Sequence, residues 1–225
     1  MTFSIAGRCN RTGAFGVAIA TSSIAVGARC PHARSGVGAV ATQNVTDPTL
    51  GILLLDLMRA GMTAAQAIRK AVEGRDNIDY RQLTAVDRHG NSASWSGARM
   101  LGTHAVSEQK DCVAAGNLLR NEDVPLAMTS AFAAHSGDHV AERLLRSLEA
   151  GLAAGGEEGP IHSAALLVVH EHQFPLVDLR CDWDEEAPIA VLRSLWAGYA
   201  PQMQAYLTRA INPAAAPSYG VAGDR

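Results

Sequence analysis

The chain has 225 residues, and its 19 Lys and Arg against 22 Asp and Glu give a formal net charge of −3. Hydrophobic residues make up 48% and charged residues 18%, which is typical of a globular protein and excludes a largely disordered chain. The near-neutral charge balance argues against a protein that binds nucleic acid or an anionic membrane surface, and no apolar run reaches the roughly 18 residues of a membrane-spanning helix. No secretion signal is visible, and four widely spaced cysteines indicate buried thiols in a reducing cytoplasm.

Four short strands are predicted within the first 45 residues. Residues 3–7 and 15–20 are strand-like, and the turn chemistry of Asn10–Gly13 between them predicts a hairpin. A third extended segment is predicted at 24–28. A fourth strand is predicted at 36–43, where small residues suit close packing between other layers.

The hydrophobic period then changes from two residues to between three and four. Leu50, Leu53, Leu54, Leu57 and Met58 predict one helix, and residues 63–74 predict a second one. The remaining predicted elements are strands at 82–86, 92–95, 103–106 and 113–115, helices at 124–134 and 139–150, strands at 163–169 and 176–181, and a final helix at 188–207.

The order of these elements predicts the fold class. Blocks of strands alternate with pairs of helices, which disfavours a doubly wound nucleotide-binding fold. Two stacked antiparallel sheets with helices outside, an α+β architecture, fit the pattern. We expect one domain over residues 1–210 and a flexible C-terminal tail over 211–225.

The N-terminus offers a candidate nucleophile. Thr2 follows the initiator Met1, and it is small enough for Met1 to be commonly removed. Removal would leave a hydroxyl and a free α-amine on one residue at the start of a strand. Such an amine has an ordinary pKa of about 8, so near neutral pH part of it accepts a proton. Many chains begin Met-Thr without any catalytic role.

Other polar residues are weaker candidates for a catalytic or binding site. Arg81–Gln82 at a strand start and Gly116–Asn117 at a strand end could supply hydrogen-bond donors. Asp178, Arg180 and Asp182 share one face of a strand. They could form either a structural ion network or a clamp that holds a substrate. His162, His170 and His172 could form a metal site, although solvated turn histidines are the simpler interpretation.

The segments that carry a family resemblance follow one another along the chain: Thr2–Ile5, Gly16–Ala18, Val26–Gly27, Gly36–Gln43, Arg81–Gln82, Gly116–Leu119, Ala141–Leu145, Ser163–Leu166 and Val177–Arg180. Together they resemble the domain of unknown function 1028 family, over roughly residues 2–200. That family is grouped with the N-terminal-nucleophile hydrolase-like folds, so the resemblance implies a four-layer αββα sandwich.

The resemblance also implies a chemistry. N-terminal-nucleophile hydrolases attack an amide carbonyl with the first residue of the mature chain, whose own amine is the base. Thr2 stands at that position. This chain departs from the family at Glu158–His162, at Cys9, which stands where an acidic residue is common, and at Trp95–Gly97. Those departures indicate a different substrate or a loss of catalysis.

The resulting hypothesis is an amidohydrolase that cleaves a small amide or lactam and needs no metal or organic cofactor. Thr2 is the nucleophile, and Asn117 with nearby backbone amides stabilises the oxyanion. The candidates for orienting the α-amine or holding a polar substrate are Arg34, Arg81, Asp178 and Arg180.

A competing hypothesis is a binding or structural module that holds a small ligand without cleaving it. Retention of Met1 would distinguish the two, because a blocked Thr2 amine cannot be a base. A metal hydrolase is a third possibility, and it requires the three histidines to converge. The broad apolar stripe of the final helix predicts a homo-oligomer, most simply a dimer.

Overall fold

The computed structural model describes residues 1–221 as ten strands and six α-helices, with three short 3-10 turns. The strands are β1 (Thr2–Arg8), β2 (Phe15–Thr21), β3 (Pro31–Arg34), β4 (Gly38–Asn44), β5 (Arg81–Asp87), β6 (Ser92–Ser96), β7 (Ala105–Gln109), β8 (Cys112–Asn117), β9 (Ser163–Val169) and β10 (Val177–Cys181). The helices are α1 (Pro48–Arg59), α2 (Ala64–Val72), α3 (Val124–Ala134), α4 (Val140–Ala153), α5 (Pro188–Tyr199) and α6 (Met203–Ile211). The 3-10 turns are η1 (Val26–Ala28), η2 (Ile78–Tyr80) and η3 (Pro213–Ala215).

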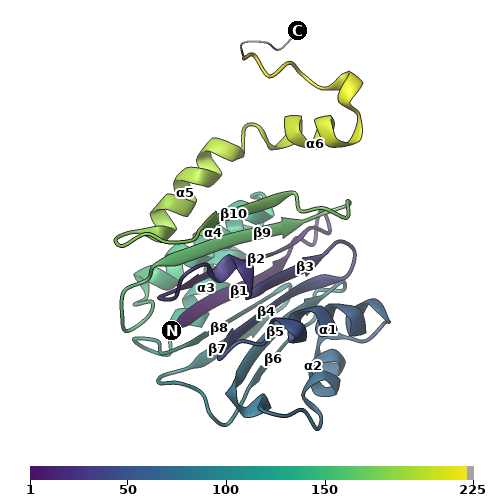
Figure 1. Ribbon diagram of the computed structural model, residues 1–225. Coiled ribbons are helices and arrows are strands. Elements are labelled where there is room, and N and C mark those ends of the chain that lie inside the picture. Colours follow the sequence, from purple (N-terminus) through teal and green to yellow (C-terminus); the bar gives the residue numbers. More distant parts are fainter. Residues whose placement is uncertain (222–225) are drawn as a thin grey trace.

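Two antiparallel sheets stack face to face, with helices on their outer faces (Figure 1). The six-stranded sheet has the order β10-β9-β2-β1-β8-β7, and the four-stranded sheet has the order β3-β4-β5-β6. Helices α3 and α4 cover the first sheet, and α1 and α2 cover the second. The α+β class and the four-layer αββα sandwich predicted from the sequence are therefore confirmed.

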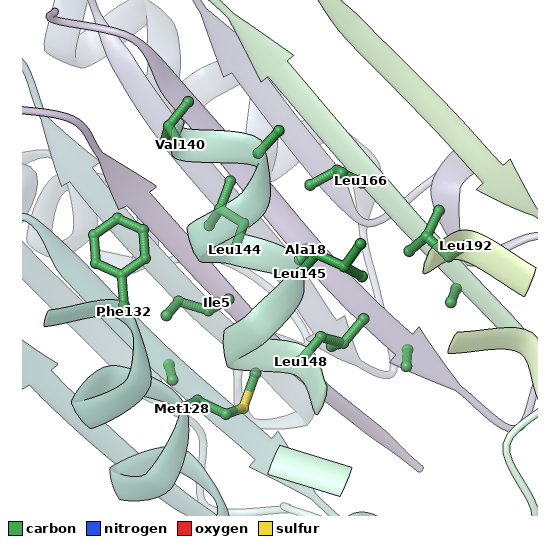
Figure 2. Packing of buried hydrophobic residues seen from close by; sticks show 14 of the residues in the cluster. Ile5, Ala18, Met128, Phe132, Val140, Leu144, Leu145, Leu148, Leu166 and Leu192 are labelled. Carbon is green, nitrogen blue, oxygen red and sulfur yellow. The ribbon is translucent and has the colours of Figure 1, made fainter. Parts of the chain in front are cut away.

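The largest apolar core lies between the six-stranded sheet and α3, α4 and α5 (Figure 2). Leu144, Leu145 and Leu148 project from α4 toward the sheet, where Ile5 and Leu166 meet them. These side chains are fully buried, so the apolar stripe of α4 fixes the helix on the strands. This core packs against the helix-facing side of β1, the strand that begins at Thr2, and holds it in place.

The contact between the two sheets is built mainly from alanine and valine side chains, with Phe15 as the one large residue of the buried cluster. Ala6 and Val17 of the first sheet belong to the same buried cluster as Ala39 and Ala41 of the second. Small residues let the two backbones approach closely, as predicted for the strand at 36–43, which the structure has at 38–44. Polar side chains from the two sheets can therefore meet where this apolar layer ends.

The segment predicted as an extended strand at 24–28 is the 3-10 turn η1 instead. Ala25 adopts a left-handed conformation with φ of 54°, and the Val26 amide donates to Ser163 Oγ at 3.2 Å. The chain is thus tied to the start of β9, and the third strand forms later, from Pro31 to Arg34.

The single final helix predicted at 188–207 is wrong, because the structure has two helices there. α5 ends at Tyr199, and the next two residues are Ala200 and Pro201. Proline lacks the N–H that would continue the ladder and clashes with the carbonyl one turn back. α6 then starts at Met203, leads away from the sheets and has no fully buried residue (Figure 1).

The tail predicted to be flexible from residue 211 contains the short turn η3 at Pro213–Ala215. Residues 222–225 of that tail lie outside the described residues. Within the described residues, no helix is both long and apolar enough to cross a membrane.

Candidate active site

Strand pairing places Thr2 between two polar side chains. β1 lies between β2 and β8, and Thr2 is directly opposite Thr21 on one side and Asn117 on the other. Directly opposed residues of an antiparallel pair point to the same face of a sheet. The register therefore brings together Thr2 and Asn117, the two residues predicted to be catalytic, and adds Thr21 to them.

This polar face looks toward the second sheet. Ser4 lies two residues after Thr2, so its side chain is on the same face, and its hydroxyl donates to Gln43 Oε1 of β4 at 2.6 Å. Phe3, between them, points the opposite way into the core under α4. The candidate site thus sits between the sheets, at the end where β1 begins.

A chain of buried amides joins the two sheets behind this face. Gln43 Nε2 donates to Gln82 Oε1 at 2.7 Å, and Asn117 Nδ2 donates to the same oxygen at 3.3 Å. Gln82 Nε2 in turn donates to the Gly116 carbonyl and to Ser96 Oγ, both at 3.2 Å. Within residues 1–221, Asn117 Oδ1 has no hydrogen-bond partner. A buried oxygen that accepts no hydrogen bond lowers the stability of the fold. This oxygen is therefore a position at which an additional donor group can bind.

The hydroxyl groups of the site are engaged by the residue before Thr2. Thr2 Oγ1 donates to the Met1 carbonyl oxygen at 2.5 Å, and the Thr21 hydroxyl donates to that same oxygen. The two hydroxyl oxygens lie 3.1 Å apart, and Thr2 is 6% exposed. With Met1 in place, the Thr2 amine is part of a peptide bond and has no lone pair free to accept a proton.

A buried carboxyl group lies close to the same terminus. After α4 the chain turns through Gly155 and Gly156, with φ of +129° and +58°, values that favour glycine. Glu157 then forms a bridge with Leu119, just beyond the end of β8. It is 3% exposed, and within residues 1–221 neither carboxyl oxygen has a hydrogen-bond partner. Burial raises its pKa to about 8, while the positive charge of the N-terminus and the nearby backbone amide of Ser22 oppose that rise.

Met1 also rests on this segment. A Cβ atom added at Gly159 would lie 2.8 Å from Met1 Cε, so the end of the methionine side chain lies directly against this glycine. The loop that follows Glu157 therefore borders the N-terminal residue, and the carboxyl group and Thr2 belong to one neighbourhood.

The raised pKa of Glu157 makes a prediction about stability. Its carboxyl group is protonated in the fold up to about pH 8, whereas the ordinary pKa in an unfolded chain is 4.5. The folded state thus binds the extra proton, and wild-type stability falls as pH rises between those values. For Glu157→Gln we expect the free energy of unfolding, relative to wild type, to rise by about 1–3 kcal/mol from pH 5 to pH 9.

Urea unfolding at the two pH values measures this difference. Glu158→Gln is the matched control, because Glu158 is exposed and should show no pH-dependent difference from wild type. Equal pH dependence in wild type and Glu157→Gln would contradict the raised pKa.

Two arginines predicted to hold substrate have other partners. Arg34 Nη1 lies 2.7 Å from Asp56 Oδ1 of α1, at the end of β3 that pairs with Gly38, the opposite end of the sheet from Gln43. Arg81 begins β5 beside Gln82, and its Nη1 donates to the Val45 carbonyl at 2.5 Å. Of these two, only Arg81 lies at the same end of the second sheet as the amide chain.

Asp178 and Arg180 form an ion pair with each other on the outermost strand. Arg180 Nε lies 2.9 Å from Asp178 Oδ1, and both side chains are more than a third exposed. The stem of Arg180 packs over Gly27. Strands β9 and β2 separate this pair from β1, so the register does not bring it next to Thr2.

The three histidines considered as metal ligands make separate contacts. His162 Nδ1 is 2.9 Å from the Ser22 carbonyl oxygen, and His170 Nε2 is 2.9 Å from that of Thr12. His172 stacks on a phenylalanine ring with centroids 5.3 Å apart. Across residues 1–221, no three His, Cys, Asp or Glu side chains gather where they could hold a metal ion.

Three residues of the site escaped the sequence analysis. Thr21 and Gln43 lie inside segments that look like ordinary strands, and their polar side chains in otherwise small or apolar runs were the available signal. Glu157 lies in a Gly- and Glu-rich connection that resembles a solvated loop. No pattern in that loop indicates that one of its two glutamates is buried.

A family described as "Family of unknown function (DUF1028)" matches residues 2–192. The crystal structure of protein SPO2555 from Silicibacter pomeroyi, assigned to the same family, is 32% identical with a TM-score of 0.82, and the match covers 88% of this chain and 86% of that one. No curated protein matches.

Two further solved structures have low similarity. Anbu (ancestral beta-subunit) from Yersinia bercovieri is 12% identical with a TM-score of 0.40, and the match covers 91% of this chain and 97% of that one. An Anbu (Gly-1) mutant from Hyphomicrobium sp. strain MC1 is 14% identical with a TM-score of 0.44, over 90% of this chain and 96% of that one.

Proposed function

This chain belongs to the DUF1028 family, and from that premise we propose that it is an amidohydrolase whose nucleophile is the hydroxyl of Thr2. The substrate is a small amide or lactam. The observation that carries the proposal is the position of Thr2 at the start of a central strand, opposite Thr21 and Asn117.

The four cysteines are free and buried, which fits a protein located in the reducing cytoplasm.

In the proposed reaction, removal of Met1 first frees the Thr2 amine. That amine takes the proton of Thr2 Oγ1 as the oxygen bonds to the amide carbonyl carbon, and a tetrahedral oxyanion forms. The ammonium then returns the proton to the leaving nitrogen as the C–N bond breaks, which leaves an ester on Thr2. Water hydrolyses the ester, with the amine again as base, and the Thr2 hydroxyl is restored.

The neighbouring groups have matching roles in this proposal. Asn117 Nδ2 has a second hydrogen besides the one donated to Gln82, and the Thr21 hydroxyl already donates to a carbonyl oxygen beside Thr2. Both can stabilise the oxyanion. Asn117 Oδ1, which lacks a partner within the described residues, accepts from the freed α-amine and orients it.

A two-part mass measurement tests the proposal. Intact mass of protein expressed without an N-terminal tag should be lower than the full-chain mass by one methionine residue. Incubation with a small β-lactone should then add the whole probe mass once, as an ester that hydroxylamine cleaves. A chain that keeps Met1 and gains no hydroxylamine-labile adduct would contradict the proposal.

The alternative is a non-catalytic ligand-binding module on the same fold. The observation that favours it is the set of contacts that hold Met1: two hydroxyl groups on its carbonyl oxygen and a close fit of its side chain against Gly159. This alternative predicts that Met1 is retained and that ligand affinity does not depend on the Thr2 hydroxyl.

Asn117→Ala tests the proposed oxyanion role. The rate constant of acylation by the β-lactone should fall about 10²–10³-fold, since one oxyanion donor is commonly worth that much. The concentration for half-maximal rate should change little, because the donor acts mainly in the transition state. Asn212→Ala, at an exposed position after α6, is the control and should react at the wild-type rate. An unchanged rate in Asn117→Ala would exclude this role.

We also propose that the chain forms a homodimer through α5 and α6. α6 contributes no buried residue, and Leu195, Tyr206 and Ile211 are between 40% and 53% exposed. Apolar surface of this kind on a projecting helix pair is typical of an association surface. Light scattering at about 10 µM should give twice the 23.6 kDa chain mass. Ile211→Glu should shift the mass toward the monomer, whereas Leu101→Glu on a distant loop should not.

A further inference from the structure

Met1 occupies the space next to the Thr2 hydroxyl. Its carbonyl oxygen accepts from Thr2 Oγ1 at 2.5 Å and also from the Thr21 hydroxyl. Its side chain ends at Gly159, where an added Cβ atom would lie 3.1 Å from Met1 Sδ and 2.8 Å from Met1 Cε. One residue therefore fills both a carbonyl position beside the candidate nucleophile and a side-chain position that leads away from it.

The Met1 carbonyl group lies where the proposed reaction needs the carbonyl group of a substrate. Its two hydroxyl donors match the two lone pairs of one carbonyl oxygen. The amine and the hydroxyl of Thr2 are bonded to adjacent carbon atoms, so an acyl group on the hydroxyl lies close to an acyl group on the amine. When Met1 is absent, another carbonyl oxygen can accept from Thr21 in the same way, and the chain behind it can enter the space that the methionine side chain leaves.

The wall at the end of the methionine side chain is fixed by main-chain hydrogen bonds. The Glu158 amide donates to the Leu118 carbonyl at 3.0 Å, and the Arg120 amide donates to the Gly156 carbonyl at 3.1 Å. These bonds tie the segment just before Gly159 to the chain that follows β8. None of them involves the first residue, so the wall stays in place when that residue is removed.

The side chain that this space accepts is unbranched and uncharged. A hexanoyl group has the same chain length as a methionyl group, with a methylene group in place of the sulfur atom. Glu157 lies in the same segment as Gly159, but both of its carboxyl oxygens are buried, so it does not present a charged group to a bound chain. The chemistry of the space therefore matches a neutral alkyl chain.

We propose that, once Met1 is removed, the vacated space binds the acyl part of a ligand whose chain is unbranched, apolar and similar in length to methionine. The ligand carbonyl oxygen accepts from the Thr21 hydroxyl, and the end of its chain lies against Gly159, which sets the preference for chain length and shape. The further statement that this ligand is the amide cleaved by Thr2 rests on the proposed function. Binding of the acyl group does not.

Isothermal titration calorimetry with hexanamide and acetamide tests the proposal. A fusion protein cleaved directly before residue 2 gives the chain without Met1, whether or not cells remove it, and Thr2→Ala prevents turnover. We expect saturable hexanamide binding with a dissociation constant below about 10 mM. Acetamide should bind at least about tenfold more weakly, because the longer chain buries additional methylene groups.

The retained methionine provides a competitor within the same molecule. The Thr2→Ala chain that keeps Met1 should bind hexanamide at least about tenfold more weakly than the chain without it, because the methionine side chain already lies against Gly159. A ligand site elsewhere on the molecule would give the same affinity in both chains.

Two glycine variants of the chain without Met1 assign the effect to one position. Gly159→Val places a branched side chain where the end of the bound chain lies, so it should weaken hexanamide binding at least about fivefold. Gly137→Val is the matched control, because no atom lies within 4 Å of a Cβ atom added there, and it should change the affinity less than about twofold. Circular dichroism verifies that both variants are folded.

Four results would each overturn the proposal: no saturable hexanamide binding, equal affinity for the two amides, equal affinity with and without Met1, or unchanged affinity in Gly159→Val. The ester adduct of the wild-type chain with a β-lactone reports on the proposed function separately. Absence of that adduct with the expected hexanamide binding would contradict the amidohydrolase alone. An adduct without the expected hexanamide binding would contradict the acyl site alone.

Discussion

Replacing Thr2 with Ala is expected to reduce amide hydrolysis, and ester formation with a β-lactone, to background. The variant keeps the α-amine after removal of Met1 but has no hydroxyl to attack the carbonyl carbon. Removing an attacking group commonly costs several powers of ten in rate. The fold should survive, because Thr2 lies at the end of β1 and outside the apolar clusters. Intact mass after probe treatment, with and without hydroxylamine, measures the loss.

Thr2→Ser is the matched control, since serine keeps both a hydroxyl and an α-amine. It should retain measurable ester formation. The wild-type rate should rise with pH through the apparent pKa of the α-amine, about 8 for an ordinary N-terminus, because only the neutral amine accepts a proton. An uncleaved N-terminal tag should abolish the reaction without unfolding the chain. Ester formation in Thr2→Ala at the wild-type rate would place the nucleophile elsewhere.

Phe132→Ala is expected to lower the free energy of unfolding by about 3–5 kcal/mol, the usual cost of removing a buried aromatic ring. The ring is 1% exposed and lies between α3 and β1, where it sits against Gly7 (Figure 2). It also stacks under the Arg143 guanidinium, whose carbon is 3.7 Å from the ring centroid. Arg143 donates twice to the Phe132 carbonyl, so its charge would remain buried beside a cavity.

Urea unfolding of the variant and of Phe174→Ala measures this cost. Phe174 lies in an exposed loop at 41% exposure, so its truncation should cost less than about 1 kcal/mol. Similar losses in both variants would show that the ring of Phe132 is not the centre of this core.

The sequence predicted most of the fold because the hydrophobic period is clear in most elements. The strand at 163–169 and the helix at 124–134 have the predicted bounds. The segment at 24–28 has the apolar pattern of a strand, but Ala25 is left-handed and the chain hydrogen-bonds to Ser163, a contact 137 residues away that no local pattern contains. Pro201 was the signal in the sequence for the break between α5 and α6.

The site is less predictable because it depends on register. The sequence identifies Thr2 and Asn117 as polar ends of strands, but only the pairing of β1 with β8 sets them opposite each other. Glu157 is beyond sequence reasoning, because its burial results from two glycines with positive φ that fold the connection back against Leu119. Positions such as these are fixed by tertiary contacts between distant segments.

The outermost strand β10 has a consequence for how this protein behaves at high concentration. An edge strand has unpaired N–H and C=O groups that can recruit an extended segment of another molecule and start aggregation. Along β10, the exposed Asp178 and Arg180 occupy alternate positions and hold each other in an ion pair. Charged groups on an edge oppose such edge-to-edge growth, so replacing both with Val or Thr should lower solubility and favour fibrillar aggregates while the sandwich itself stays folded.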